Sequence, residues 1–346
     1  MTADLPAARG PLSAMIVAAL RGDGPADADV ARTLATAVRA PLGDDDLHLG
    51  LYLLYELSYR GLPGVDDARE WDPAIVACRI AIEERFEAAL RARVPSVAVE
   101  PAEVPARLRA LARDGDGALS RFLERKADLD AFREFLIHRS AYHLKEADPH
   151  SFAIPRLGGA PKVALVEIQA DEYGAGDATW MHAALFAQTM RGLELDDTYG
   201  AYVGRIPGTT LATVNLMSLF GLHRRLRGAI VGHLAMFELT STLPNRRYGN
   251  GLRRLGFDET ATRFFDEHVE ADAVHEAIAA NDLAGGLVAA EPHLAADVLF
   301  GARALLELDD LAADAMLSAW TAGGSSLRPS TNERAVAAEP EAGRVA

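Results

Sequence analysis

The chain has 346 residues, a formal net charge of −15 at pH 7, and 49% apolar residues. It is therefore long enough to bury a sizeable core, in one large or two modest domains. The negative charge argues against a general affinity for nucleic acid or anionic membranes. A single cysteine, Cys78, excludes an internal disulfide, a thiolate-held iron–sulfur cluster and a structural zinc site.

The sequence contains no evident targeting or membrane segment. A short apolar run at 15–20 is followed by Arg21 and Asp23, where a signal peptide would continue with apolar residues and a cleavage site. The longest apolar-rich stretch, 211–222, contains Asn215 and is too short to cross a bilayer. We therefore expect a cytoplasmic protein that binds neither nucleic acid nor membranes.

The distribution of residue types predicts an all-α fold, because Ala, Leu and Arg dominate and runs of Val, Ile and Thr are scarce. Helices are predicted, in chain order, near 11–21, 27–39, 45–60, 73–93, 103–113, 117–145, 177–191, 208–220, 222–239, 248–255, 258–281 and 293–320. The stretch 94–105 is expected to be a connector and 151–160 a loop, while 163–169 fits either a short strand or a helix start.

We expect these elements to form a single domain. A flexible segment, 1–10, precedes N-terminal helices within 11–116, which are expected to pack on a helical bundle of residues 117–322. The composition of residues 323–346 predicts a disordered tail.

One short stretch, 268–275, carries the strongest chemical signal. At 100° per residue, His268, Asp272 and His275 lie at about 0°, 40° and −20° around a helix. Two imidazoles and one carboxylate on one stripe form a donor set suited to a first-row metal ion. The alternative interpretation is a solvated polar face or a set of hydrogen-bonded neighbours.

Four further side chains with apolar neighbours strengthen the metal hypothesis: Glu146, Glu172, His182 and Glu238. Each of them alone fits a satisfied core group or an exposed face, but burying a lone carboxylate costs several kcal/mol. Together, several acids and imidazoles in a helical bundle are typical of a dinuclear carboxylate-bridged site. The repeated Glu-x-x-His pattern of ferritin-like proteins is absent, since the nearest equivalent, Asp272-x-x-His275, occurs once.

These motifs resemble the haem-oxygenase-like diiron oxidases and oxygenases, also described as iron-containing redox enzymes. The resemblance covers about residues 117–310 and depends on Lys145-Glu146-Ala147-Asp148, Asp171-Glu172-Tyr173-Gly174 followed by His182, Phe237-Glu238, and His268-x3-Asp272-x2-His275. It implies a haem-oxygenase-like helical bundle without haem, and the metal ligands Glu146, Glu172, His182, Glu238, His268, Asp272 and His275. It also implies two Fe(II) ions, O2 as co-substrate, an external electron donor and a homodimer. Glu238 is our expected bridging ligand.

Several residues near these ligands are candidate contacts. Arg246-Arg247-Tyr248 follows Pro244-Asn245 and is interpreted as a basic loop that holds a substrate carboxylate, although a solvated loop fits as well. Tyr173, Phe237 and Asn215 are candidate pocket residues, with simple packing as the alternative. His143 and His150 flank Glu146 and are candidates for supporting a metal ligand.

The resemblance implies a non-haem diiron enzyme that uses O2 to oxidise a small molecule. We expect N-oxygenation of an amino-acid-like amine, because the Arg-Arg-Tyr segment suits a carboxylate-bearing substrate. Oxidative C–C cleavage or desaturation of an amino or fatty acid is the alternative within this class. A non-catalytic iron-binding protein is an alternative from another class. A haem-dependent oxygenase lacks a clear proximal ligand, since His48 lies mid-helix among leucines.

Overall fold

A computed structural model describes residues 5–115 and 117–329, without the side chains of Asp114 and of residues 271–274. Within these residues the secondary structure is helical and contains no strand, which confirms the predicted all-α fold. The α-helices are α1 (Pro11–Arg21), α2 (Ala28–Ala37), α3 (Asp45–Glu56), α4 (Pro73–Arg93), α5 (Val104–Asp114), α6 (Ala118–Arg125), α7 (Leu129–His143), α8 (Asp148–Ser151), α9 (Gly159–Glu172), α10 (His182–Gly192), α11 (Gly208–Leu222), α12 (Arg227–Arg254), α13 (Glu259–Ala277), α14 (Gly286–Ala290) and α15 (Ala295–Thr321).

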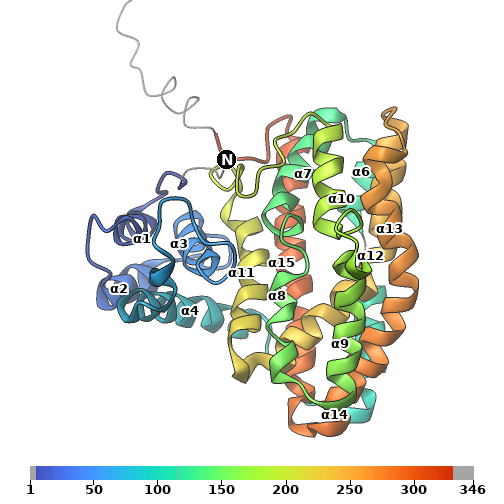
Figure 1. Cartoon of the computed structure of the whole chain (residues 1–346), viewed down its shortest axis with the longest axis horizontal. Helices are drawn as coiled ribbons and strands as arrows, with labels where there is room; N and C mark the ends of the chain where they lie inside the picture. The colour runs from blue at the N-terminus through green and yellow to red at the C-terminus, as the bar shows by residue number, and fades with distance from the viewer. Residues whose placement is uncertain (1–4, 116, 330–346) are drawn as a thin grey trace, which may run out of the picture.

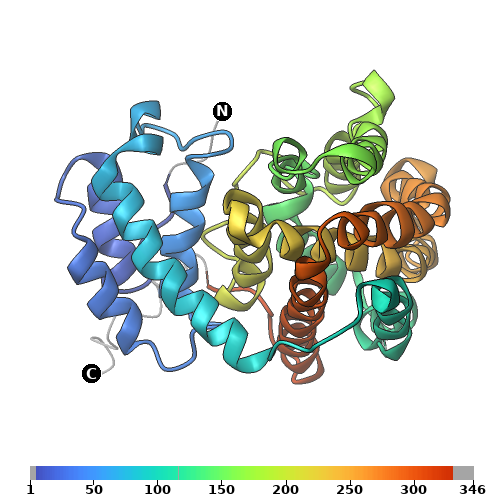
Figure 2. The ribbon, with the colours of Figure 1, turned by 90° about the horizontal axis from the view of Figure 1, so that it is seen from below.

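The helices form two layers that meet at α11. Helices α1 to α4 lie on one side, and α11 separates them from the remaining helices (Figure 1). The view from below shows the same division (Figure 2). The N-terminal helices start where acidic side chains satisfy their first amides. Asp27 accepts from the backbone of Asp29 and Val30, and Asp44 and Asp72 cap α3 and α4 in the same way.

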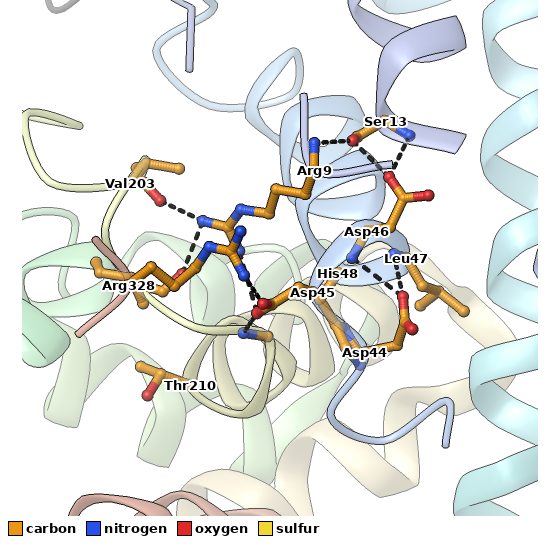
Figure 3. A network of polar contacts seen from close by, with 12 residues as sticks. Arg9, Ser13, Asp44, Asp45, Asp46, Leu47, His48, Val203, Thr210 and Arg328 are labelled. Atoms are coloured by element: carbon orange, nitrogen blue, oxygen red, sulfur yellow. Dashed lines mark hydrogen bonds and ion pairs between the residues drawn. The ribbon is translucent and has the colours of Figure 1, made fainter. Parts of the chain in front are cut away.

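A network around Asp45 joins the segment before α1 to the rest of the fold (Figure 3). The Arg9 guanidinium donates to the carbonyls of Val203 and Ile206 at 2.6 and 2.7 Å and lies 3.7 Å from Asp45. Arg328 pairs with the same carboxylate. The prediction of a flexible segment 1–10 is therefore wrong for the described residues around Arg9.

The described part of the predicted tail is also held in place. Ser325 and Ser326 donate to the Glu134 carboxylate of α7, and Leu327 is only 8% exposed. The prediction of disorder from residue 323 is therefore wrong for 323–329, because these residues satisfy a carboxylate and bury an apolar side chain. Residues 330–346 lie outside the described residues.

The predicted helix 117–145 is two helices, α6 and α7. Lys126 and Ala127 end α6 by donating to the Phe122 carbonyl. Asp128 then starts α7, because its side chain accepts from the amide of Ala131 at 2.9 Å. A capping aspartate thus restarts the helix without any glycine or proline at the break.

Two helices predicted separately, 222–239 and 248–255, are a single helix. Helix α12 continues through Pro244, so the expected basic loop at Arg246-Arg247-Tyr248 is wrong. Proline costs one intrahelical hydrogen bond and normally ends a helix. Here α12 has buried residues on both sides of Pro244, including Leu234 and Leu252, and this packing offsets the local loss.

Other boundaries differ by a few residues. The undecided stretch 163–169 lies within α9, and the expected loop 151–160 contains the end of α8, a 3-10 turn at Ile154–Arg156 and the start of α9. Helix α13 passes into a π-helix, Ile278–Gly285. Within the described residues, no single helix is long and apolar enough to span a membrane. The segments His275–Ala290 and Pro292–Thr321 reach that length and apolar composition only when taken together, and a bend of 118° separates them.

The crossing of α12 and α15 depends on two glycines. A Cβ atom on Gly232 would overlap the backbone carbonyl of Val298, and one on Gly301 would overlap that of Ala229. Since neither carbonyl belongs to a movable side chain, the two helices approach at backbone distance only because both positions lack a side chain.

Candidate metal centre

Six of the seven predicted ligands converge on one buried region. Their donor atoms form two groups, and within each group the donors lie within 4.8 Å of one another. The Glu146 group contains Glu146, Glu172, His182 and His268, and the Glu238 group contains Glu172, Glu238 and His275. The side chain of the seventh residue, Asp272, lies outside the described residues.

The residue common to both groups is Glu172, at the C-terminal end of α9. We expected Glu238 to be the bridging ligand, whereas the residue that belongs to both groups is Glu172. A carboxylate has two oxygens and can contact two cations at once. The arrangement is therefore that of two adjacent groups of potential metal-binding atoms that share one carboxylate.

In the Glu146 group, backbone geometry fixes the orientation of an imidazole. His268 Nδ1 donates to the Phe264 carbonyl at 2.8 Å, so Nε2 carries the lone pair and lies 3.7 Å from Glu146 Oε1. His182, the first residue of α10, places Nδ1 2.9 Å from Glu172 Oε2. The carbonyl contact of His268 is typical of imidazoles that bind metal ions.

In the Glu238 group, His275 is oriented by an acid that sequence reasoning missed. His275 Nε2 lies 2.9 Å from Asp171 Oδ2, and Nδ1 faces Glu238 Oε2 at 3.5 Å. A carboxylate–imidazole pair of this kind fixes the tautomer and raises the basicity of the nitrogen that binds metal. The available signal was the position of Asp171 directly before Glu172.

All six residues are buried, with at most 6% of each residue's surface exposed. Nδ1 of His182 and Nδ1 of His275 have no hydrogen-bond partner among the described residues, although carboxylate oxygens lie nearby. Buried polar atoms without partners are rare and call for an explanation. Imidazole nitrogens and carboxylates converging on one point satisfy the donor preferences of iron, manganese or zinc, so the residues fit a metal ion.

In the metal-free protein, neighbouring histidines affect the pKa values of the buried carboxyl groups. Burial raises the pKa of Glu146, but the imidazoles of His143 and His268 outweigh burial and hold that pKa below its usual range. Burial raises the pKa of Glu172 too, but His182 and His268 lower it, and the net effect is a lowered pKa. Burial lowers the pKa of His182 and of His275, but Glu172 and Glu238 respectively raise them above the ordinary value, so these two imidazoles carry positive charge beside the acids.

The metal-free protein is expected to lose stability as the pH rises from about 6.5 to 9. Burial lowers the pKa of His275, but Glu238 and Asp171 raise it to about 9, above its ordinary value of 6.5. Because the folded pKa is the higher one, the stabilisation is complete below pH 6.5 and is lost as the pH passes about 9. Denaturant unfolding of chelator-treated protein across this range measures the loss.

A His275→Gln variant should show a flatter stability profile over the same pH range. The matched control is His293→Gln, since the His293 side chain is 68% exposed and its replacement should leave the slope unchanged. An unchanged slope in the His275 variant would contradict the assignment of this pH dependence.

Of the two histidines that flank Glu146, one supports it and the other does not bond to it. His143 Nδ1 lies 3.0 Å from Glu146 Oε2, as expected for a group that orients a ligand. His150 instead pairs with His233, with 3.1 Å between Nε2 and Nδ1. Both His150 and Glu146 line a small cavity between the two metal groups.

A cavity of about 720 Å³ opens beside the metal groups. His143, His268 and Phe237 line its inner end, and Phe237 and His268 also border the small cavity beside the ligands. Phe237 thus stands between the two spaces. The candidate substrate residues Arg246, Arg247 and Tyr248 line the large cavity as well, from helix α12 rather than from a loop.

Two other candidate pocket residues lie elsewhere. The Tyr173 hydroxyl donates to Asp148 at 2.9 Å and contacts Ser151. Asn215 is fully buried, and its amide donates to His48, joining α11 to α3. Neither side chain lines the large cavity, so the structure favours the packing interpretation for both.

The fold and the site define an all-α protein with a buried carboxylate–imidazole cluster able to hold metal. A family model described as an iron-containing redox enzyme matches residues 133–310, just over half of the chain and the span of all seven predicted ligands. The chain belongs to this family of iron-containing redox enzymes.

The chain is also similar to nitrosourea synthase from Streptomyces achromogenes subsp. streptozoticus. The two sequences are 26% identical over 184 residues, which make up 52% of this chain and 39% of that protein. The match therefore spans about two fifths of the relative's length.

Proposed function

We propose that this chain is a non-haem diiron oxygenase that transfers oxygen to nitrogen in an amino-acid-like amine. The observation that carries the proposal is the pair of donor groups sharing Glu172. Two adjacent positions with mixed carboxylate and imidazole donors suit a pair of Fe(II) ions. When bound, such a pair would supply the activation of O2, with electrons from an external donor.

The residues of the chain would hold the reactants and exclude water. The Glu146 group and the Glu238 group would each hold one iron, and Phe237 separates that region from the large cavity. The arginines of the large cavity would attract an anionic group of the substrate. The proposed reaction balances as amine, O2, two electrons and two protons giving a hydroxylamine and water.

The similarity to nitrosourea synthase favours nitrogen as the oxidised atom, since the name describes a product with a nitroso nitrogen. The match covers only part of that relative, so its activity serves as a guide to the class of product. C–C cleavage and desaturation would use the same metal positions and are the competing outcomes.

The test supplies anaerobically Fe(II)-loaded protein with O2, a reductant and a panel of amino acids, amines and fatty acids. Mass spectrometry is expected to show one added oxygen bound to nitrogen. Products that lack a carbon fragment or contain a new alkene, without an N–O bond, would reverse the assignment. Oxygen uptake indifferent to every organic compound would instead favour an iron-binding protein without a substrate.

A further inference from the structure

Two opposite charges face the large cavity without pairing with each other. Arg139 of α7 and Asp309 of α15 both line it. Within the described residues, neither side chain has an oppositely charged group within 4.0 Å. Both side chains are only partly exposed. Buried charges normally pair, so two opposite charges that line one cavity without an ion pair are candidates for binding a ligand that carries both charges.

The surroundings of Arg139 keep it charged and oriented. Burial lowers its pKa, but Tyr248 and Asp309 raise it, and the net effect is a raised pKa. Its guanidinium carbon lies 5.4 Å from the centre of the Phe135 ring. An aromatic ring beside a guanidinium limits its motion, and Tyr248 occupies one of its five donors.

Asp309 has the complementary character. Burial raises the pKa of its carboxyl group, while Arg139 lowers it, and the net effect is a raised pKa. A cationic ligand stabilises the ionised form of a carboxyl group most strongly where the surroundings stabilise that form poorly. An ammonium group is such a ligand.

Arg139 also lies close to the metal region along its own helix. It precedes His143 by four residues on α7, which places the two on one face about 6 Å apart along the helix axis. His143 contacts the ligand Glu146. Arg246, by contrast, follows Glu238 by eight residues on α12, about 12 Å along the axis.

We infer that Arg139 and Asp309 form a receptor for the zwitterionic end of an α-amino acid. Arg139 binds the α-carboxylate, Asp309 binds the α-ammonium group, and the side chain of the amino acid extends to the metal groups. This inference rests on the proposed function and narrows its substrate class. It also moves carboxylate recognition from Arg246-Arg247 to the deeper Arg139.

Binding can be tested separately from turnover. The Fe(II)-containing protein is kept under nitrogen and titrated calorimetrically with the common α-amino acids. The tightest binder is then compared with two analogues, the amine lacking its α-carboxylate and the acid lacking its α-amino group. We expect each analogue to bind at least about tenfold more weakly than the amino acid.

The variants should remove these preferences selectively. Arg139→Met should abolish the preference over the decarboxylated amine, with partial recovery in Arg139→Lys. Asp309→Asn should abolish the preference over the deaminated acid. A purely structural role would weaken all three compounds together. The controls are Arg133→Met on α7, whose guanidinium pairs with Glu194 at 2.6 Å, and Glu307→Gln on α15, which pairs with Arg93 at 2.6 Å.

The inference is overturned if no amino acid binds, if both analogues bind as tightly as the amino acid, or if the variants weaken all three compounds equally. Because no oxygen is present, these results do not depend on the reaction catalysed. If an amino acid binds with these preferences but no N–O product forms, the assignment of Arg139 and Asp309 is supported and N-oxygenation is contradicted.

Discussion

Replacing Glu172 by alanine is expected to remove both metal ions, whereas replacing any other ligand should weaken mainly one position. Glu172 is the only residue that belongs to both donor groups among the described residues. Its loss leaves three donors in the Glu146 group and two in the Glu238 group. Iron content measured by elemental analysis after anaerobic loading should fall toward zero, and oxygen consumption should fall with it by at least about 100-fold.

Two comparisons make this prediction specific. Glu238→Ala should leave the Glu146 group intact and reduce iron to about one equivalent, on the principle that each ion depends on its own donors. Glu167→Ala, at an exposed position of the same helix α9, should retain full metal content. If Glu172→Ala keeps one tightly bound iron while Glu238→Ala loses both, the bridging position belongs to Glu238, as the sequence led us to expect.

A second large effect is expected from Gly232→Ala on α12. The new methyl group would overlap the Val298 carbonyl, and neither backbone can move without separating α12 from α15. Overpacking a core costs about 1–3 kcal/mol when side chains can adjust, so a collision with backbone should cost at least about 3 kcal/mol. Chemical denaturation monitored by circular dichroism measures this loss.

The control for this prediction is Gly50→Ala on α3. The nearest atoms to a Cβ there are 3.7 Å away, an ordinary contact distance, and alanine is favoured over glycine within a helix by about 1 kcal/mol. That variant should be neutral or slightly stabilised. Equal stability of the Gly232 and Gly50 variants would show that the helices can separate at no cost.

The sequence predicted those parts of the fold that depend on local chemistry. Asp27 and the acidic run at 44–46 predict helix starts, because aspartate side chains accept hydrogen bonds from the first backbone amides of a helix. The helix predicted near 73–93 is α4, in which Asp72 is the capping residue and Pro73 the first helical residue, and the Val- and Pro-rich segment follows it. These signals act within one or two turns of the chain.

Errors arose where distant packing outweighed local preference. Pro244 would end an isolated helix, but α12 continues because its buried face packs on α13 and α15. At Asp128 the error was in the other direction, because one long helix was predicted where the chain forms two. The aspartate that caps the second helix is present in the sequence. The local sequence indicates which backbone conformations are unfavourable, but it does not show the tertiary contacts that can offset their free-energy cost.

The sequence pointed to the types of side chain that converge in the buried cluster, but not to their division into two groups. Acids and imidazoles in apolar surroundings point to a metal, and the helical spacing of His268 and His275 places them on one stripe. Which carboxylate belongs to both groups depends on how α9, α10 and α12 pack together, and the sequence of any one of these helices does not contain that information. Arg139 and Asp309 were missed for the same reason, since 170 residues of chain separate them.

The glycine contact between α12 and α15 has a consequence for protein engineering. Helix α12 carries Glu238, and α15 carries Asp309. Because Gly232 and Gly301 set the spacing of these helices through main-chain atoms, the distance between α12 and α15 at this crossing does not depend on the polar side chains that line the large cavity. Polar lining residues on these two helices, such as Arg246, can therefore be exchanged to accept new compounds without changing that distance.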